Sequence, residues 1–426
     1  MKKISVFIVM SFFIMCCVLW DRLPDEAVNN DNDKEAATEK LSISSIQNVS
    51  AEIFNDIYRP LNFSRQKAMW FTYMDYEKIL AGKSEDEFTA ETEKRFRTAA
   101  MMGINTVYVQ VRGFCDAYYC SELFPTGKYY TDQSFDPLKI MIKKAHSLGL
   151  SFHAWINPLR CMTTDELNST DTGFRFRQWY DSSETKGKVI VQNGDRWYLN
   201  PAYPEVSEYI CDGICEIIRN YSVDGIHIDD YFYPTTELLF DKDAFDKSGS
   251  TDIDEWRRDN INKLVKSMYK SVKSMNNNVL FGISPQGNTE VDYQKQYADV
   301  EKWLSEGGYC DYIVPQIYYG YLNETCPFSE TVIKWKEIAA KGSTSLVIGL
   351  CTYKSGSEDK WAGKGRDEWI NDTGIISRQV KECTKNNDID GVAIYSYSST
   401  FEEGKSSEIM VMGPVQEIRE SLEVYK

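Results

Sequence analysis

VDGIHIDDYFYP, from Val223 to Pro234, has the pattern of a short strand that ends in two acids. Alternation of β-branched and small residues as far as Ile228 predicts a strand, and Pro234 marks where it stops. Adjacent carboxylates among three aromatic residues are costly to build for stability alone, because acids repel and a buried unpaired charge is unfavourable. We interpret Asp229 and Asp230 as functional residues at a strand end, the alternative being a solvated loop.

From about Lys67 onward the chain contains eight runs of this kind, of which residues 223–230 are the fourth. Each run has a polar end and is followed by a helical stretch. The predicted strands are 68–74, 106–112, 151–158, 223–230, 279–286, 311–319, 345–353 and 390–398, and the helices 88–102, 137–148, 204–221, 256–275, 291–305, 330–340, 375–386 and 407–420. Eight alternating pairs predict an α/β fold, a (β/α)₈ TIM barrel in a single domain. An open doubly wound sheet would need a Gly-rich turn after its first strand, and residues 69–76 (MWFTYMDY) offer none.

The segment from Cys161 to Tyr198 is too long for an ordinary connection between a strand and a helix. We predict an insertion after the third strand, which forms a lobe over that strand's carboxyl end. Insertions at this end of a barrel shape substrate sites.

Composition limits the classes of partner. The 426 residues carry a net charge of −16, so the protein is repelled by nucleic acid and anionic lipid. Its 27 Tyr and 10 Trp residues favour a stacking partner such as a sugar, although most of these rings belong in the core. We expect a monomer that binds a polysaccharide and no nucleic acid.

The N-terminus predicts export. Lys2 and Lys3 precede an apolar run, so residues 1–20 are interpreted as a signal peptide or an N-terminal anchor, with lipidation at Cys16 or Cys17 as a third alternative. Residues 21–55 have the composition of a flexible polar tether, and residues 56–426 form the predicted catalytic domain. The domain would lie outside the cell membrane, anchored to it or secreted, and would touch membrane only through its N-terminal segment.

The carboxyl ends of barrel strands converge on one site, so residues at those ends are candidates for function. Carboxylates that cleave a glycosidic bond, amides and an Arg that hold hydroxyls, and rings that stack on sugars are typical of a carbohydrate site. The candidates for substrate binding are Arg112, His153, Trp155, Asn157, Arg160, His227, Tyr231, Ser284, Gln316, Tyr318 and Tyr395.

The predicted catalytic residues are Asp229, Asp230 and Asp116. Strand parity turns Asp229 into the barrel mouth, as nucleophile or charge stabiliser, and leaves Asp230 as a second carboxylate or orienting group. A general acid needs an apolar setting that raises its pKa, which Asp116 among Phe114, Tyr118 and Tyr119 would have. Asp75 and Glu290 are the alternatives.

Metal chemistry is a weaker alternative. His153, His227 and Asp229 would make a legitimate divalent-metal set, but HxH and HExxH spacings are absent from the sequence. We interpret the histidines as core or sugar-binding residues and expect no metal and no cofactor.

Several long motifs, in order, resemble the glycosyl-hydrolase-like family 10 proteins, which are bacterial exported (β/α)₈ proteins. They are VYVQVR followed by Asp116-Ala117, FHAWINPLR, WYLNPAYPEV, VDGIHIDDYFYP, WRRDNIN, FGISPQGN and DYIVPQIYY. The resemblance implies a cell-envelope glycan as substrate, such as peptidoglycan strands without stem peptides. It carries functional roles to Arg112, Asp116, Asn157, Arg160, His227, Asp229, Asp230, Ser284 and Gln316.

The chain departs from that family in residues 113–127 (GFCDAYYCSELFPTG) and at Gln286-Gly287. Its fourth strand also resembles that of the α-amylase clan, in which the matching Asp is the nucleophile, but the clan's Glu after the fifth strand is missing here. The resulting hypothesis is an exported glycoside hydrolase with a carboxylate pair. The alternatives are a barrel that binds glycan without cutting it and a metal-dependent hydrolase.

Overall fold

The computed structural model describes residues 58–401 and 413–423. The predictions for residues 1–20 and 21–55 therefore fall outside the described residues, as does the start of the predicted helix 407–420. Within the described residues, no helix is both long and apolar enough to cross a membrane.

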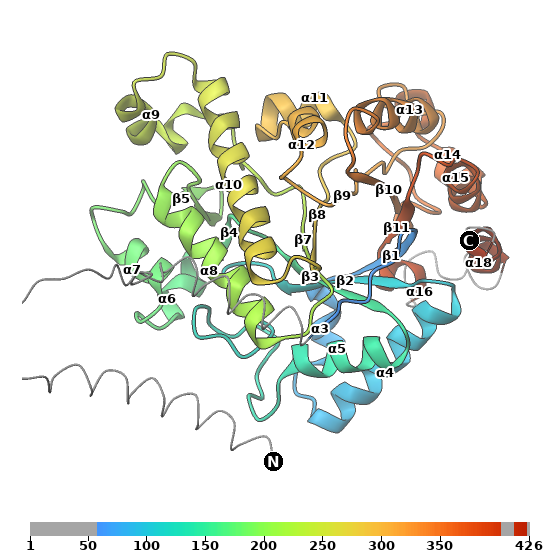
Figure 1. Ribbon diagram of the computed structural model, residues 1–426, viewed down its shortest axis with the longest axis horizontal. Helices are drawn as coiled ribbons and strands as arrows, with labels where there is room; N and C mark the ends of the chain where they lie inside the picture. Colours follow the sequence, from blue (N-terminus) through green and yellow to red (C-terminus); the bar gives the residue numbers. More distant parts are fainter. Residues whose placement is uncertain (1–57, 402–412, 424–426) are drawn as a thin grey trace, which may run out of the picture. The chain divides into compact units, whose positions relative to one another are not determined.

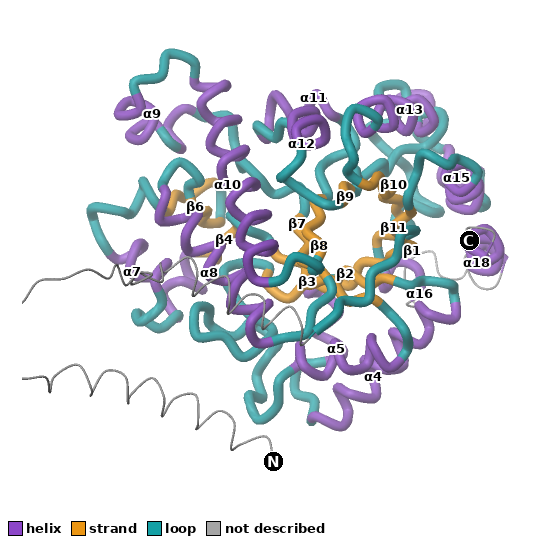
Figure 2. The backbone as a smooth tube through the Cα atoms, viewed as in Figure 1, coloured by secondary structure: helices purple, strands orange, loops and turns teal. Residues whose placement is uncertain are grey.

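Eight parallel strands close into a barrel, as predicted, and Figure 2 shows their ring with the helices outside it. The order around the barrel is β1-β2-β3-β7-β8-β9-β10-β11, with β11 paired to β1. The strands are β1 (Gln66–Phe71), β2 (Thr106–Arg112), β3 (Ser151–Ile156), β7 (Gly225–Ile228), β8 (Leu280–Ile283), β9 (Tyr312–Ile313), β10 (Ser345–Cys351) and β11 (Gly391–Tyr395).

Seven of the main helices connect consecutive barrel strands, and α18 follows the last strand, β11 (Figure 1). They are α4 (Glu85–Met101), α5 (Pro137–Ser147), α8 (Pro204–Asn220), α10 (Ile253–Met275), α12 (Val300–Glu306), α13 (Phe328–Ala339), α15 (Ile375–Thr384) and α18 (Gly413–Glu423). Local chemistry sets their starts: Ser84 and Glu87 form a capping box before α4, and Pro137 stands in the first turn of α5 after the N-cap Asp136.

Shorter helices complete the chain. They are α3 (Tyr76–Ile79), α9 (Lys242–Ser248), α11 (Thr289–Val291), α14 (Glu368–Asn371) and α16 (Tyr397–Phe401), with 3₁₀ turns at Tyr73–Asp75, Leu238–Phe240 and Gly363–Gly365. The predicted helix 291–305 is wrong as a single element. It is divided into α11, a π-helical turn (Asp292–Gln296) and α12, because Tyr297 adopts a left-handed conformation with φ 58°.

The predicted insertion after the third strand is present. It contains α6 (Thr164–Ser169), α7 (Arg175–Asp181) and a separate antiparallel sheet in the order β4 (Arg160–Thr163), β6 (Arg196–Leu199), β5 (Ile190–Asn193). The first strand of this small sheet begins four residues after β3 ends, which brings Arg160 close to the barrel mouth.

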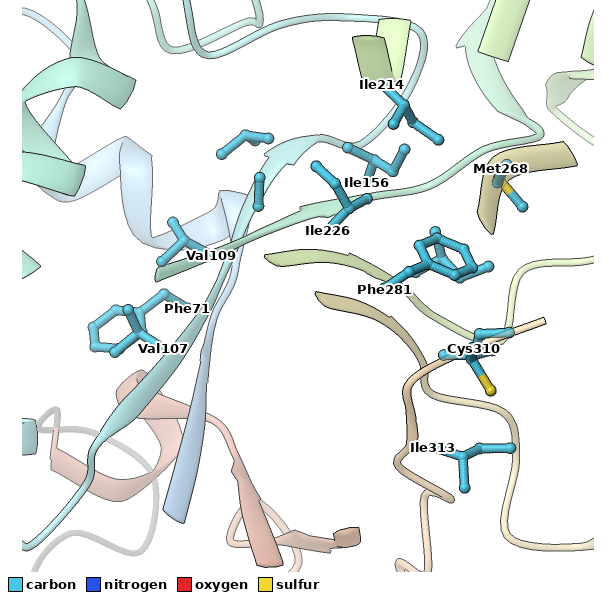
Figure 3. Close-up of a cluster of buried hydrophobic side chains, with 14 of the residues drawn as sticks. Phe71, Val107, Val109, Ile156, Ile214, Ile226, Met268, Phe281, Cys310 and Ile313 are labelled. Atoms are coloured by element: carbon cyan, nitrogen blue, oxygen red, sulfur yellow. The ribbon is translucent and has the colours of Figure 1, made fainter. Parts of the chain in front are cut away.

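The apolar core has two parts. The outer part fills the space between strands and helices, where Ile156 and Ile226 lie near Ile214 of α8 (Figure 3). The inner part fills the barrel with Ala68, Trp70, Tyr108, Trp155, Tyr312, Val314, Val347 and Ala393. Glycine makes room for these rings, since a Cβ on Gly282 would lie 1.9 Å from the Tyr312 ring.

Candidate active site

A cavity of about 900 Å³ opens at the carboxyl ends of the strands. It is lined by Trp70, Thr72, Tyr73, Met74, Asp75, Lys78, Gln110, Trp155, Arg160, Asp229, Asp230, Tyr231, Gln316, Tyr318, Tyr353, Tyr395, Ser396, Ser398 and Ser399. A volume of this size lies at the upper end of the range for small-molecule binding sites. Of the predicted site residues, Trp155, Arg160, Asp229, Asp230, Tyr231, Gln316, Tyr318 and Tyr395 line it.

Asp229 lies at the floor of this cavity, directly after β7, and is 4% exposed. The side-chain nitrogen of Asn157 donates to both of its carboxylate oxygens, at 2.6 and 2.5 Å. Asn157 is itself held by Gln110, whose Nε2 donates to Asn157 Oδ1 at 2.5 Å. The backbone N–H of Tyr73 donates in turn to Gln110 Oε1 at 3.0 Å. The ends of β1, β2 and β3 thus fix the orientation of one carboxylate on β7.

Asp230 faces the same cavity and has a separate support. Gln316 Nε2 donates to Asp230 Oδ1 at 3.1 Å and to the backbone oxygen of Ser284, also at 3.1 Å. The Ser284 hydroxyl donates to the backbone oxygen of Val314 at 2.8 Å, so it ties β8 to the neighbouring strand and does not line the cavity. The two adjacent carboxylates are therefore held by different amides, Asn157 after β3 and Gln316 after β9.

Both carboxyl groups resist ionisation. Burial, together with the nearby charge of Asp230, raises the pKa of Asp229 to about 7 against the opposing effects of Arg160 and Asn157. Burial also raises the pKa of Asp230, opposed mainly by its hydrogen bond from Gln316. Two neighbouring acids in a shielded cavity titrate as a pair, so the pair retains a proton at higher pH than ordinary carboxyl groups do.

Arg160 supplies positive charge beside the pair. Its guanidinium carbon lies 3.9 Å from the centre of the Tyr231 ring and 4.5 Å from that of Phe114. Between these two rings the planar group is oriented by stacking, and its charge favours the ionised forms of Asp229 and Asp230. Tyr231 is 43% exposed and forms part of the cavity wall.

The two predicted histidines lie one layer below the cavity, in the barrel interior. Trp70 Nε1 donates to His227 Nε2 at 3.2 Å, and His227 Nδ1 lies 3.0 Å from the Tyr312 hydroxyl. That hydroxyl lies 2.7 Å from His153 Nδ1, and His153 Nε2 lies 3.0 Å from the Ser151 hydroxyl.

Burial lowers the pKa of His153 to about 4 and that of His227 well below its usual value, so both rings are neutral. Because every ring nitrogen of the two histidines has a protein partner, this pair offers no lone pair to a divalent metal ion. The described part of the chain contains no other group of three His, Cys, Asp or Glu side chains with metal-binding geometry.

Arg112 points away from the cavity, for a reason that alternation alone does not reveal. The pairing of β2 with β3 shifts register between Gln110 and Arg112, and this β-bulge turns Arg112 to the outer face of the barrel. There it is 1% exposed, 4.4 Å from the Phe124 ring centre, under Gly213 of α8.

Asp116 is also outside the residues that line the cavity. Its Oδ1 accepts the backbone N–H groups of Gly113 and Phe114 at 2.9 and 2.8 Å, and burial raises its pKa. This carboxylate holds the turn that follows β2. Its predicted catalytic role has no support from the geometry of the cavity.

Several functional candidates escaped the sequence analysis. Trp70 and Thr72 line the cavity. The alternation of side chains along β1 places both on the inner face of the barrel, so the sequence pattern could have predicted them. Met74, Lys78, Ser396 and Ser399 lie beyond the strand ends, where strand alternation no longer applies: Lys78 is in α3 and Ser399 in α16. Asp292, in the π-helical turn, accepts the backbone N–H of Gln286 at 3.1 Å, and burial raises its pKa strongly.

The fold and the site together define a barrel with an acidic, aromatic-lined cavity of the kind found in glycoside hydrolases. The family model described as glycosyl hydrolase-like 10 matches residues 66–364. The chain belongs to this family, which confirms the resemblance seen in the sequence motifs.

Curated relatives agree with this assignment. The glycosyl hydrolase YngK of Bacillus subtilis is 33% identical over 300 residues, which cover 64% of this chain and 57% of that protein. The glycosyl hydrolase DigH of Escherichia coli is 33% identical over 295 residues, which cover 61% of this chain and 64% of that protein. The chain thus matches less than two thirds of either relative's length.

Solved structures are similar in fold. The glycoside hydrolase domain of PgaB (BpsB) from Bordetella bronchiseptica gives a TM-score of 0.55 at 10% identity, covering 84% of this chain and 99% of that one. The catalytic domain of β-amylase from Paenibacillus polymyxa also gives 0.55, at 11% identity, over 85% and 98% of the two chains. At these identities the comparison establishes the (β/α)₈ fold alone.

Proposed function

We propose that this protein is an exported glycoside hydrolase that cleaves glycosidic bonds in a cell-envelope or extracellular glycan, with peptidoglycan-like strands as the favoured substrate. Asp229 and Asp230 perform the chemistry, and the protein acts as a monomer without cofactor. The single observation that carries the proposal is the oriented acid pair at the cavity floor, with Asn157 holding Asp229 and Gln316 holding Asp230.

The cavity around the pair supports a sugar substrate. Tyr231 and Tyr353 present partly exposed rings for stacking on apolar sugar faces, and the hydroxyls of Ser396, Ser398 and Ser399 suit hydrogen bonding to substrate hydroxyls. Export and the choice of an envelope glycan rest on the N-terminal sequence and on the kinship with the glycosyl hydrolase-like 10 family.

The test is release of reducing ends from purified peptide-free peptidoglycan strands by the full-length protein, compared with Asp229→Asn. Asp195→Asn is the matched control, because Asp195 is exposed in the turn between β5 and β6, away from the cavity residues. Hydrolysis by the parent and by the control, and a loss of roughly a thousandfold or more in Asp229→Asn, is the expected result. Equal rates in all three proteins would remove Asp229 from the mechanism.

A barrel that binds glycan without cutting it is distinguished in the same experiment. Such a protein would retain strand binding in the parent and in Asp229→Asn and would release no reducing ends from any glycan.

A further inference from the structure

The two acids of the cavity are neighbours in the chain, and this limits the mechanism. Asp229 and Asp230 both line the cavity at the end of β7, so they approach a bound sugar from one side. Hydrolysis by two carboxylates requires them to flank the scissile bond, one as acid and the other as nucleophile or base on the opposite face of the ring. An opposing carboxylate must therefore come from elsewhere in the cavity.

The other acids near the strand ends do not supply one. Asp116 is used by the backbone of Gly113 and Phe114. Glu290 is exposed outside the cavity lining and accepts a hydrogen bond from Gln294 at 3.0 Å.

Asp75 lines the cavity, but its Oδ2 accepts the backbone N–H of Thr72 at 2.9 Å and so caps the turn after β1. Among the described residues, the cavity lining contains no carboxylate besides these three: Asp75, Asp229 and Asp230. Because Asp75 holds the turn after β1 and Asp229 and Asp230 lie together, no carboxylate of the described cavity lining remains for the far face of the sugar.

We propose that the nucleophile is supplied by the substrate itself, as the carbonyl oxygen of a 2-acetamido group on the sugar whose bond is cleaved. The inference rests on the glycoside hydrolase function proposed above and narrows its substrate to 2-acetamido-2-deoxy-hexosides. In the gluco configuration the attacking group must lie trans to the leaving group, so the bonds cleaved are β-linked.

The two acids then have different roles. Asp229 is the deeper one and both of its oxygens are fixed, so it accepts a hydrogen bond from the acetamido N–H and stabilises the positive charge that develops there. Asp230 is more exposed and donates its proton to the glycosidic oxygen as the bond from C1 to that oxygen breaks. The acetamido oxygen bonds to C1 at the same time and forms a cyclic oxazolinium ion.

Water completes the reaction. Asp230, now a carboxylate, takes a proton from water while the water oxygen attacks C1 and the ring opens to restore the acetamido group. Asp230 ends protonated and one water has been consumed, with net retention at C1.

The cavity floor beside Asp229 fits an acetamido group. Trp70 and Trp155 present indole surfaces suited to the methyl group. The indole N–H of Trp155 is buried and has no hydrogen-bond acceptor within the described residues. Burial raises the pKa of the Tyr318 and Tyr395 hydroxyls, which therefore remain donors that can orient the acetamido oxygen.

The experiment uses full-length protein with β-linked N-acetylglucosamine oligosaccharides, together with the peptide-free strands. Proton NMR of the first product should show the β-anomer. A thiazoline analogue of the oxazolinium ion should bind at least a hundredfold more tightly than the product sugar. Replacing acetyl by the less nucleophilic trifluoroacetyl should reduce kcat tenfold or more.

Two variants separate the roles. On an aryl β-glycoside of N-acetylglucosamine, whose leaving group departs without a proton from the protein, azide should restore turnover to Asp230→Ala and yield a β-glycosyl azide. It should not restore turnover to Asp229→Ala, which should also lose its affinity for the thiazoline.

An initial α-product, or equal cleavage of de-N-acetylated chains, would overturn substrate assistance and leave the hydrolase function intact. Absence of cleavage on every glycan would overturn both proposals.

Discussion

The side-chain nitrogen of Asn157 lies 2.6 and 2.5 Å from the two carboxylate oxygens of Asp229, and it donates to both. A donor shared in this way fixes the plane of the carboxylate and favours its ionised form. Gln110 of β2 donates to Asn157 Oδ1 and so fixes the orientation of the amide that holds Asp229. The orientation of the acid therefore depends on an amide on another strand.

Removing that amide should affect catalysis more than folding. In Asn157→Ala the hydrogen bonds that favour the carboxylate are lost, so the pKa of Asp229 rises and the acidic limb of the kcat/KM profile moves to higher pH. Loss of orientation should lower kcat roughly a hundredfold. Rates measured from pH 4 to 9 test this, with Asn277→Ala, an exposed site, as control. An unchanged acidic limb would contradict the positioning role.

Asp229 should destabilise the fold as the pH rises. Its pKa is about 7 in the folded protein against 3.8 for the free side chain, so the unfolded state binds fewer protons between these values and stability falls across that window. Asp229→Asn removes the buried charge, although its own amide then meets that of Asn157.

The free energy of unfolding should therefore rise by about 2 kcal/mol at pH 8 relative to the parent, and the gain should vanish near pH 4. Denaturant titrations at the two pH values measure it, with Asp195→Asn as control. A loss of stability of equal size at both pH values would show that burial does not raise the pKa of Asp229 in the folded protein.

Arg160 should act through its charge and its stacking. In Arg160→Met the cation beside Asp229 and Asp230 disappears, which raises the pKa of both acids, and the rings of Phe114 and Tyr231 lose their partner. The acidic limb should again move to higher pH, and kcat/KM should fall roughly tenfold or more. Arg419→Met, an exposed change on α18, is the matched control. If Arg160→Met raises KM but does not shift the pH profile, Arg160 acts only by stacking on the two rings.

Much of the fold could be predicted because its pattern is local. The alternation in residues 106–112 predicted β2 with the observed bounds, and Pro137 marked the start of α5. The predicted strand 311–319 is reduced to Tyr312–Ile313, because Pro315 lacks the N–H that further pairing would need. The length of β9 depends on its pairing with neighbouring strands, which a local sequence pattern does not contain.

The site was predicted less completely than the fold. Parity indicated Asp229 at the mouth because β7 is regular up to that point. The prediction of Arg112 from its place at a strand end was wrong, since one bulge reverses the side-chain direction there. Strand parity also does not give the depth of a side chain inside the barrel. It therefore could not distinguish His153 and His227, which lie in the barrel interior, from the inward-pointing residues that line the cavity.

The packing inside the barrel gives a final prediction, on stability. A Cβ on Gly282 would lie 1.9 Å from the ring of Tyr312, whose hydroxyl contacts both His153 and His227 beneath the site. The ring cannot move away in a filled barrel, so Gly282→Ala should cost about 3 kcal/mol or more of unfolding free energy. Gly374→Ala is the matched control: its nearest neighbours are 3.6 Å away and its φ is −96°, so we expect a change within about 0.5 kcal/mol. Thermal and denaturant unfolding of both variants measure the difference, and equal stability would mean that the barrel interior has space to repack.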